Sequence, residues 1–151
     1  MNASMITNWP SNLSPSEWPE GTLKHMDHLL FTNAVFPLRE KSGIPMMPSS
    51  LFEAHVRYEG KSRHSTSFGA RLSDATDFHV STIDKMLIMM DVAESIDTIG
   101  GIGIYFDTNT PMVHIDVRPN RLVWLRTKAG EYVYKANGHI KFYRALGDEL
   151  K

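Results

Sequence analysis

The most regular hydrophobic pattern in the chain begins at Ser81. Apolar residues then recur at helical spacing, at Ile83, Met86, Leu87 and Met90, which is typical of a helix that packs one face on a core. Ser81 has the side chain of a good N-cap, so the helix is predicted to begin there. The helical spacing of the methionines favours core packing over a metal or cofactor site.

A second apolar stripe precedes it, formed by Leu23, Met26, Leu30 and Ala34. It predicts a helix from Thr22, the expected N-cap, to about Phe36; Pro37 can interrupt the helix, and Gly43 closes the segment. Residues 1–21 are rich in Pro, Ser and Asn and predict an irregular N-terminal arm, in which two tryptophans indicate packing against the rest of the chain. The remainder, residues 22–151, is predicted to form one domain.

The C-terminal third alternates between short apolar runs and turn residues, which is the pattern of strands. The predicted strands are 102–106, 112–117, 122–125 and 132–134, with an earlier short strand at 77–80 and a last helix at about 138–150. Helices followed by a meander of short strands indicate an α+β fold, with helices packed on a small, mainly antiparallel sheet. Segment 45–52 is predicted to be extended. Segment 53–74 is long, polar and without periodicity, and loops of that size are usually functional or disordered.

Composition narrows the function classes. The 151 residues suit one domain with one core, and the net charge of -1 gives no basic field for nucleic acid. The lack of cysteine excludes disulfides, thiolate zinc sites and cysteine nucleophiles. No apolar stretch approaches the roughly 20 residues of a membrane span, and no signal-peptide pattern opens the chain. We therefore expect neither membrane insertion nor a nucleic-acid partner.

Candidate chemistry concentrates on a few histidines and aspartates. His64 lies in the polar segment, Asp77 begins a predicted strand, and His114 and Asp116 lie in the apolar run 112–117. Side chains alternate along a strand, so His114 and Asp116 share a face, and burying either without a partner is costly. A zinc ion would satisfy them and leave a fourth position for water. A His–Asp hydrogen bond that joins two strands is the alternative.

Short motifs, in this order, resemble the M15 family of zinc peptidases, in particular its D-Ala-D-Ala carboxypeptidases and murein endopeptidases. They are Ser62-x-His64, Ala75-x-Asp77, the strand Val113-His114-Ile115-Asp116-Val117, and Trp124 after it. Segments 36–45 and 100–105 also resemble the family, so the likeness spans about residues 30–126. It implies a fold like that of the hedgehog and D-Ala-D-Ala peptidase domains.

Carried over residue by residue, the resemblance implies that His64, Asp77 and His114 bind Zn2+. The ion would lower the pKa of a bound water and polarise the scissile carbonyl. The family also has an arginine upstream of the first ligand, which steadies the substrate or the developing oxyanion. Arg57 is the best match for it and Arg63 is the second choice.

One departure from the family pattern concerns the second ligand. Twelve residues separate His64 from Asp77, which is more than the family usually has. The excess indicates a loop insertion within 65–72. Asp74 is therefore a rival ligand, although Ala75-x-Asp77 fits the motif better.

Another departure concerns the catalytic base. Pro111 stands three residues before the last ligand, where many members of the family carry an acid or a histidine. Asp116, on the same strand face as His114, is our candidate for the base or for the partner that orients His114. Asp107 and His79 are the remaining candidates.

The function implied by the resemblance is hydrolysis of a peptide bond in the stem peptide of bacterial peptidoglycan, by an endopeptidase or a carboxypeptidase. The short chain without a signal peptide or wall-binding repeat resembles phage lysis or virion proteins. Such a protein would reside in the host cytoplasm or the virion and act on the cell wall. The alternative is a catalytically weak or inactive peptidase-fold module with a binding or structural role in a virion, which Pro111 favours.

Overall fold

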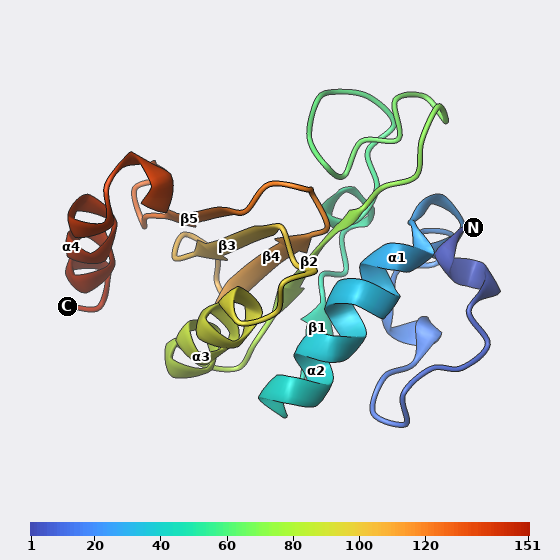
Figure 1. Ribbon diagram of the computed structural model, residues 1–151, viewed down its shortest axis with the longest axis horizontal. Helices are drawn as coiled ribbons and strands as arrows, with labels where there is room; N and C mark the ends of the chain where they lie inside the picture. The colour runs from blue at the N-terminus through green and yellow to red at the C-terminus, as the bar shows by residue number, and fades with distance from the viewer.

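Six strands form one sheet in the computed structural model, which describes residues 1–151 (Figure 1). They are β1 (Met47–Pro48), β2 (Ala75–His79), β3 (Gly101–Tyr105), β4 (Met112–Asp116), β5 (Leu122–Arg126) and β6 (Tyr132–Tyr134). The order is β1-β2-β4-β3-β5-β6, and every neighbouring pair is antiparallel except β3 and β5. The predicted α+β class with a mainly antiparallel sheet is confirmed. The predicted simple meander is wrong, because β4 lies between β2 and β3 and because β5 runs parallel to β3.

One face of this sheet is apolar and buried. Its side chains alternate along the strands as expected for a half-buried sheet, and they are Phe78, Ile102, Ile104, Val113, Ile115, Val123 and Leu125. Helices α2 (Phe36–Ser42) and α3 (Ile83–Glu94) cover this face and lie on the same side of the sheet in Figure 1. Met86, Met89 and Met90 of α3 are buried in the core, which confirms core packing for the methionines.

The first helical segment runs further along the chain than predicted. Its parts are α1 (His28–Leu30), a π-helical stretch η4 (Phe31–Val35) and α2. The N-cap is Asp27, whose carboxylate accepts from the Leu29 amide at 2.9 Å, whereas Thr22 makes no capping bond.

Pro37 lies inside this helical segment and does not end it. A proline has no N–H, so the carbonyl four residues earlier, that of Asn33, loses its helical donor. The Thr98 hydroxyl donates to that carbonyl instead, and the π-helical stretch relieves the crowding around the ring. The predicted end at Phe36 is therefore wrong, whereas Gly43 closes the segment as expected, as the residue that caps the end of α2.

The other two helices follow the sequence pattern closely. Helix α3 begins one residue later than predicted, because Thr82 is its N-cap and accepts from the Lys85 amide at 3.2 Å. Helix α4 (His139–Glu149) packs against β5 and β6 at one end of the molecule, as Figure 1 shows. None of the helices combines the length and apolar character that crossing a membrane requires.

The N-terminal arm packs into the same core as the sheet, as its tryptophans indicated. Ala3, Leu13 and Trp18 are buried in that core, and Trp9 contacts Trp18 and the helical segment through aromatic edges. Its regular structure consists of 3-10 turns, η1 (Ala3–Met5), η2 (Pro15–Glu17) and η3 (Leu23–His25). Two further 3-10 turns are η5 (Phe52–Ala54) and η6 (Lys135–Asn137).

The polar segment from residue 55 to residue 74 has no helix or strand of its own. It rises beyond the edge of the sheet in Figure 1 and returns to it at β2. A single bridge between Arg57 and Ser65 ties its two limbs together. Residues of this long loop, among them Arg57 and His64, reach the face of the sheet that the helices leave open.

Candidate metal centre

The open face of the sheet carries the polar residues that the sequence singled out. The strand register places Asp77, His114, Gly103, Trp124 and Tyr134 in one row across β2, β4, β3, β5 and β6. Residues two positions away along each strand point to the same face. The neighbouring rows therefore contribute Asp116, Gly101 and Leu122 on one side and His79, Met112, Tyr105, Arg126 and Tyr132 on the other.

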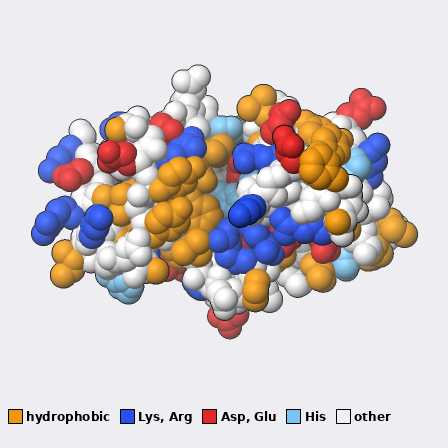
Figure 2. Space-filling view, turned by 90° about the horizontal axis from the view of Figure 1, so that it is seen from above, with side chains coloured by type: hydrophobic (Ala, Val, Ile, Leu, Met, Phe, Trp, Pro, Cys, Tyr) orange, Lys and Arg blue, Asp and Glu red, His pale blue; other side chains and the backbone are white.

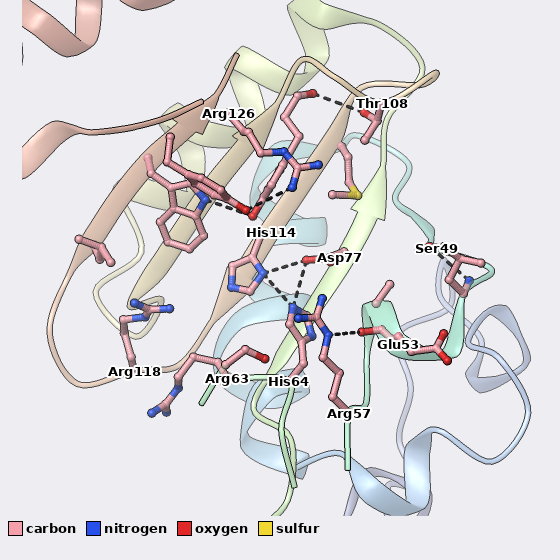
Figure 3. Close-up of a pocket in the computed structure, with 18 of the residues that line it drawn as sticks. Ser49, Glu53, Arg57, Arg63, His64, Asp77, Thr108, His114, Arg118 and Arg126 are labelled. Carbon is pink, nitrogen blue, oxygen red and sulfur yellow. Dashed lines mark hydrogen bonds and ion pairs between the residues drawn. The ribbon is translucent and has the colours of Figure 1, made fainter. Parts of the chain in front are cut away.

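Three potential ligand atoms converge where the long loop meets this row (Figure 3). His114 Nδ1 lies 2.8 Å from Asp77 Oδ1, and His64 Nε2 lies 3.2 Å from His114 Nδ1 and 3.4 Å from Asp77 Oδ1. Ligand atoms about 2.0 Å from a tetrahedral zinc ion are about 3.3 Å apart. All three residues are buried. The group therefore has the donor types, spacing and burial needed to hold a metal ion.

Asp116 supports His114 from behind. The ring of His114 turns Nδ1 toward Asp77, so its Nε2–H donates to Asp116 Oδ2 at 3.0 Å. Asp116 Oδ1 accepts from the amides of Gly101 and Arg118 at 2.8 and 3.0 Å, and the Arg118 guanidinium binds both oxygens. The carboxylate is completely buried. Such a partner fixes the tautomer and orientation of a histidine whose other nitrogen faces a metal.

Strong electrostatic coupling accompanies this geometry. Burial by itself would lower the pKa of His114, but hydrogen bonds to Asp116 and Asp77 outweigh it and raise the pKa to about 9. Burial would likewise raise the pKa of both carboxyls. Hydrogen bonds from the histidines overcome this for Asp77, and those from His114 and Arg118 do so for Asp116, so both pKa values lie well below the ordinary range. The cluster thus holds two carboxylates around one protonated imidazole, a proton that a metal ion would displace.

His64 reaches the cluster from the long loop. The Arg57 amide donates to the His64 carbonyl at 2.8 Å, and the Thr66 amide donates to the Arg57 carbonyl at 2.7 Å. These two bonds hold the loop against its neighbouring limb and direct the imidazole inward. His64 Nδ1 is buried without a partner within the chain. The chain therefore orients the ring of His114 with a hydrogen bond to its second nitrogen but gives His64 no such bond.

The structure separates the two candidates for the second ligand. Asp77 belongs to the cluster. Asp74 instead forms an ion pair with Arg63, whose Nε lies 2.9 Å from Asp74 Oδ1. This geometry favours Asp77, and it also shows that Arg63 is engaged by a carboxylate of the chain itself.

A cleft of about 630 Å³ opens above the cluster, a volume in the usual range for small-molecule sites. Its cationic lining residues are Arg57, Lys61, Arg63, Arg118 and Arg126, against the carboxylates Glu53 and Asp77. Figure 2 shows Lys and Arg side chains gathered beside the hollow in which histidine atoms are visible. Three of these arginines are already paired with carboxylates of the chain, Arg63 with Asp74, Arg118 with Asp116 and Arg126 with Asp107. Arg57 and Lys61 are the cations of the cleft without a carboxylate partner, and they can meet an anionic ligand.

Arg57 lines the same cleft near the metal cluster. Its Nε donates to the Glu53 carbonyl at 3.1 Å, which leaves the terminal nitrogens of an exposed guanidinium without a partner in the chain. Figure 3 shows Arg57 beside His64. The arginine that the resemblance favoured is therefore the one that faces the cleft with donors available.

The candidates for a base differ in access to the cleft. Asp116 is completely buried behind His114, which favours its role as an orienting partner over that of a base. Asp107 is paired with Arg126 at 2.8 Å. His79 lines the cleft, and its Nδ1 donates to the Thr110 carbonyl at 3.0 Å, so the lone pair of its Nε2 is available in the neutral ring.

Two glycines of β3 make room for this arrangement. A Cβ on Gly103 would lie 2.5 Å from Cε2 of Trp124, whose indole lies beside the His114 ring with centroids 5.0 Å apart. A Cβ on Gly101 would lie 2.2 Å from Asp116 Oδ2. Only the absence of a side chain at these positions lets the indole and the carboxylate pack directly on the strand.

Sequence reasoning missed the aromatic part of the cleft. Tyr105, Tyr132 and Tyr134 line it together with Trp124. The alternation in Tyr132-Val-Tyr134 places both tyrosines on one face of a strand, and that signal was present in the sequence. Which face it is depends on the pairing of β6 with β5, which no local pattern specifies.

Comparison of the chain with models of known protein families, with curated proteins and with solved structures gives no match. The buried group of His64, Asp77 and His114, which can hold a metal ion, is therefore the feature from which a function must be argued.

Proposed function

We propose that the chain is a zinc-dependent peptidase of the M15 type that hydrolyses a peptide bond in bacterial peptidoglycan. The observation that carries the proposal is the convergence of His64 Nε2, Asp77 Oδ1 and His114 Nδ1 within 3.4 Å of one another. Two imidazoles and one carboxylate suit Zn2+ and leave a coordination position open for chemistry. The motif order around these residues supports the peptidase assignment.

The proposed chemistry divides among a few residues. A zinc ion in the site would act as a Lewis acid that activates water and polarises the scissile carbonyl. Asp116 accepts the Nε2–H of His114, so Nδ1 is the nitrogen that would face the ion once its proton is displaced. Arg57 offers its free guanidinium donors to a substrate carboxylate or to the developing oxyanion. His79 Nε2 is the exposed nitrogen that can accept a proton in the cleft.

The charge of the cleft supports the substrate class. Stem peptides of peptidoglycan carry several carboxylates, and two cationic side chains of the cleft, Arg57 and Lys61, have no carboxylate partner in the chain. The proposed setting is a phage lysis or virion protein, present in the host cytoplasm or the virion and acting on the cell wall.

Metal analysis tests the centre directly. We expect about one zinc per chain in the purified protein, strongly reduced in His64→Ala and Asp77→Ala and retained in Asp74→Ala, because Asp74 is paired with Arg63 outside the cluster. The Asp74 variant is the matched control for loss of a neighbouring, partly buried carboxylate. A wild-type protein that takes up no zinc, even when incubated with it, would contradict the metallopeptidase assignment.

A second function is favoured by Pro111, which occupies the position of the usual base. In that case the chain is a peptidase-fold binding or structural module of a virion. Incubation of the zinc-loaded protein with purified peptidoglycan separates the two. New amino groups released by the wild type but not by His114→Ala support the peptidase. A zinc-containing protein that binds walls of several types without releasing any product supports the module.

A further inference from the structure

Aromatic side chains form a continuous surface that extends from the metal cluster to the edge of the sheet. Trp124 and Tyr134 follow His114 in the same cross-strand row, and Tyr105 and Tyr132 belong to the next row. All four aromatic residues line the cleft. In Figure 2 a group of hydrophobic side chains lies directly beside the histidine atoms of the hollow. We call Tyr132 and Tyr134 the tyrosine platform.

The two rings of the platform are nearly parallel, and one of them is exposed to solvent. The rings of Tyr132 and Tyr134 lie 14° from parallel with centroids 6.2 Å apart, because the two residues are two positions apart on β6. Tyr132 is 48% exposed. The indole of Trp124 continues the surface toward the cluster, with its centroid 6.4 Å from that of Tyr134. Trp124 is tilted by 44° against Tyr134 and is 6% exposed, so the accessible apolar surface is that of the tyrosine pair.

Polar groups surround this apolar face. The Arg126 guanidinium lies 4.6 Å from the ring centroid of Tyr105 and donates to the Tyr132 hydroxyl at 3.2 Å. It is also held by Asp107. An exposed aromatic ring with hydrogen-bonding groups at its margin matches a pyranose ring, which has an apolar C–H face and hydroxyls around its edge. An apolar peptide side chain would gain little from the polar margin.

We propose that the tyrosine platform binds a sugar ring of the glycan strand to which the stem peptide is attached. This inference rests on the proposed function, since the peptide and the sugar would belong to one substrate. The platform adds a glycan subsite that recognises the wall polymer beside the bond to be cut.

The distance across the sheet adds a constraint on the bond that is cut. Three strand spacings separate β4, which carries His114, from β6, and at about 4.8 Å each they amount to about 14 Å. An extended peptide spans at most about 3.5 Å per residue. A sugar on the platform therefore places the peptide bond at the cluster about four residues away, which favours the far part of the stem peptide over the bond nearest the sugar.

Binding to two matched probes tests the platform independently of catalysis. The probes are a soluble disaccharide–pentapeptide of peptidoglycan and the same pentapeptide without the sugar, titrated into full-length protein kept in chelator to prevent turnover. We expect the Tyr132→Ala/Tyr134→Ala double variant to bind the disaccharide–pentapeptide about tenfold more weakly than wild type does, with unchanged affinity for the pentapeptide. Phenylalanine at both positions keeps the rings and should retain most of the binding.

Tyr143→Ala is the matched control, because Tyr143 is 49% exposed on α4 outside the cleft, and it should bind both probes as wild type does. An equal loss for both probes would show that the platform contacts peptide, and no loss for either would show that it is no subsite; each result overturns the proposal. Platform-dependent sugar binding by a zinc-loaded protein that hydrolyses neither probe would refute the peptidase function and leave the sugar subsite standing. If the double variant hydrolysed and bound the disaccharide–pentapeptide as well as wild type does, the peptidase function would stand and the sugar subsite would be refuted.

Discussion

At the scale of single residues, the metal centre depends on which nitrogen of each imidazole faces inward. His114 presents Nδ1 to the cluster because Asp116 holds the hydrogen on Nε2. His64 presents Nε2, and its other nitrogen has no partner in the chain. Asp116 therefore carries most of the support that the protein supplies to its ligands, and its removal should weaken the centre without removing a ligand.

The substitution Asp116→Asn tests that support. An amide keeps the shape of the side chain but loses the charge that orients His114, and loss of such a partner typically weakens metal affinity about 10- to 100-fold. We expect a rise of that size in the zinc Kd, measured by competition with a chelator, while circular dichroism confirms the fold. Asp107→Asn, which removes a carboxylate paired with Arg126 instead, should leave the Kd unchanged. Equal affinities of the two variants would contradict the assigned role of Asp116.

At the scale of elements, the sequence predicts the positions of helices and strands but not the order in which the strands pair. The periodicity in α3 and α4 and the alternation in β3 to β6 are strong enough to place these elements. The group of His64, Asp77 and His114, which can hold a metal ion, was predicted through residue type and through the order of motifs that resemble the M15 family. The sheet order was not predicted, because β2 pairs with β4 across more than 30 residues of chain. The tyrosine platform was missed for the same reason.

The start of α3 also depends on the folded backbone and not on the local sequence alone, and this can be measured. Both Ser81 and Thr82 have N-cap side chains, and only the folded backbone selects Thr82, whose hydroxyl accepts from the Lys85 amide. Thr82→Ala should lower the free energy of unfolding by about 1 kcal/mol, as determined from urea denaturation. Ser81→Ala, which removes only a surface contact with Lys85, should stay within about 0.5 kcal/mol of wild type. A larger loss of unfolding free energy in Ser81→Ala than in Thr82→Ala would show that Ser81 is the N-cap.

At the scale of the whole molecule, buried ionisable groups couple folding to pH. His55 is completely buried between the Thr76 hydroxyl and the Ser49 carbonyl, and burial lowers its pKa. His114 has the opposite shift, because its two carboxylate partners raise its pKa to about 9 in spite of burial. The shift of His55 therefore favours the folded state at high pH and that of His114 favours it at low pH. Together they should place the pH of maximum stability near the ordinary histidine pKa of 6.5.

The signs follow from linkage between proton binding and folding. The raised pKa of His114 contributes stability that is complete below pH 6.5 and is lost as the pH rises through about 9. The lowered pKa of His55 contributes stability that is lost as the pH falls below 6.5, and the lowered pKa values of Asp77 and Asp116 add a loss in stronger acid. In chelator, the free energy of unfolding should therefore be highest near pH 6.5 and fall by on the order of 2 kcal/mol toward pH 9.

Excess zinc should abolish the alkaline slope. Binding the ion requires His114 to release its proton, so zinc binding becomes more favourable as the pH rises toward 9 and offsets the loss of stability seen in chelator. Urea unfolding between pH 6.5 and 9, with chelator and with zinc, measures both slopes on one protein. His114→Gln should abolish the difference between them, since the variant lacks both the titrating ring and the ligand. Parallel slopes in the two conditions would show that the ion and the proton do not compete at His114, and that the metal binds elsewhere.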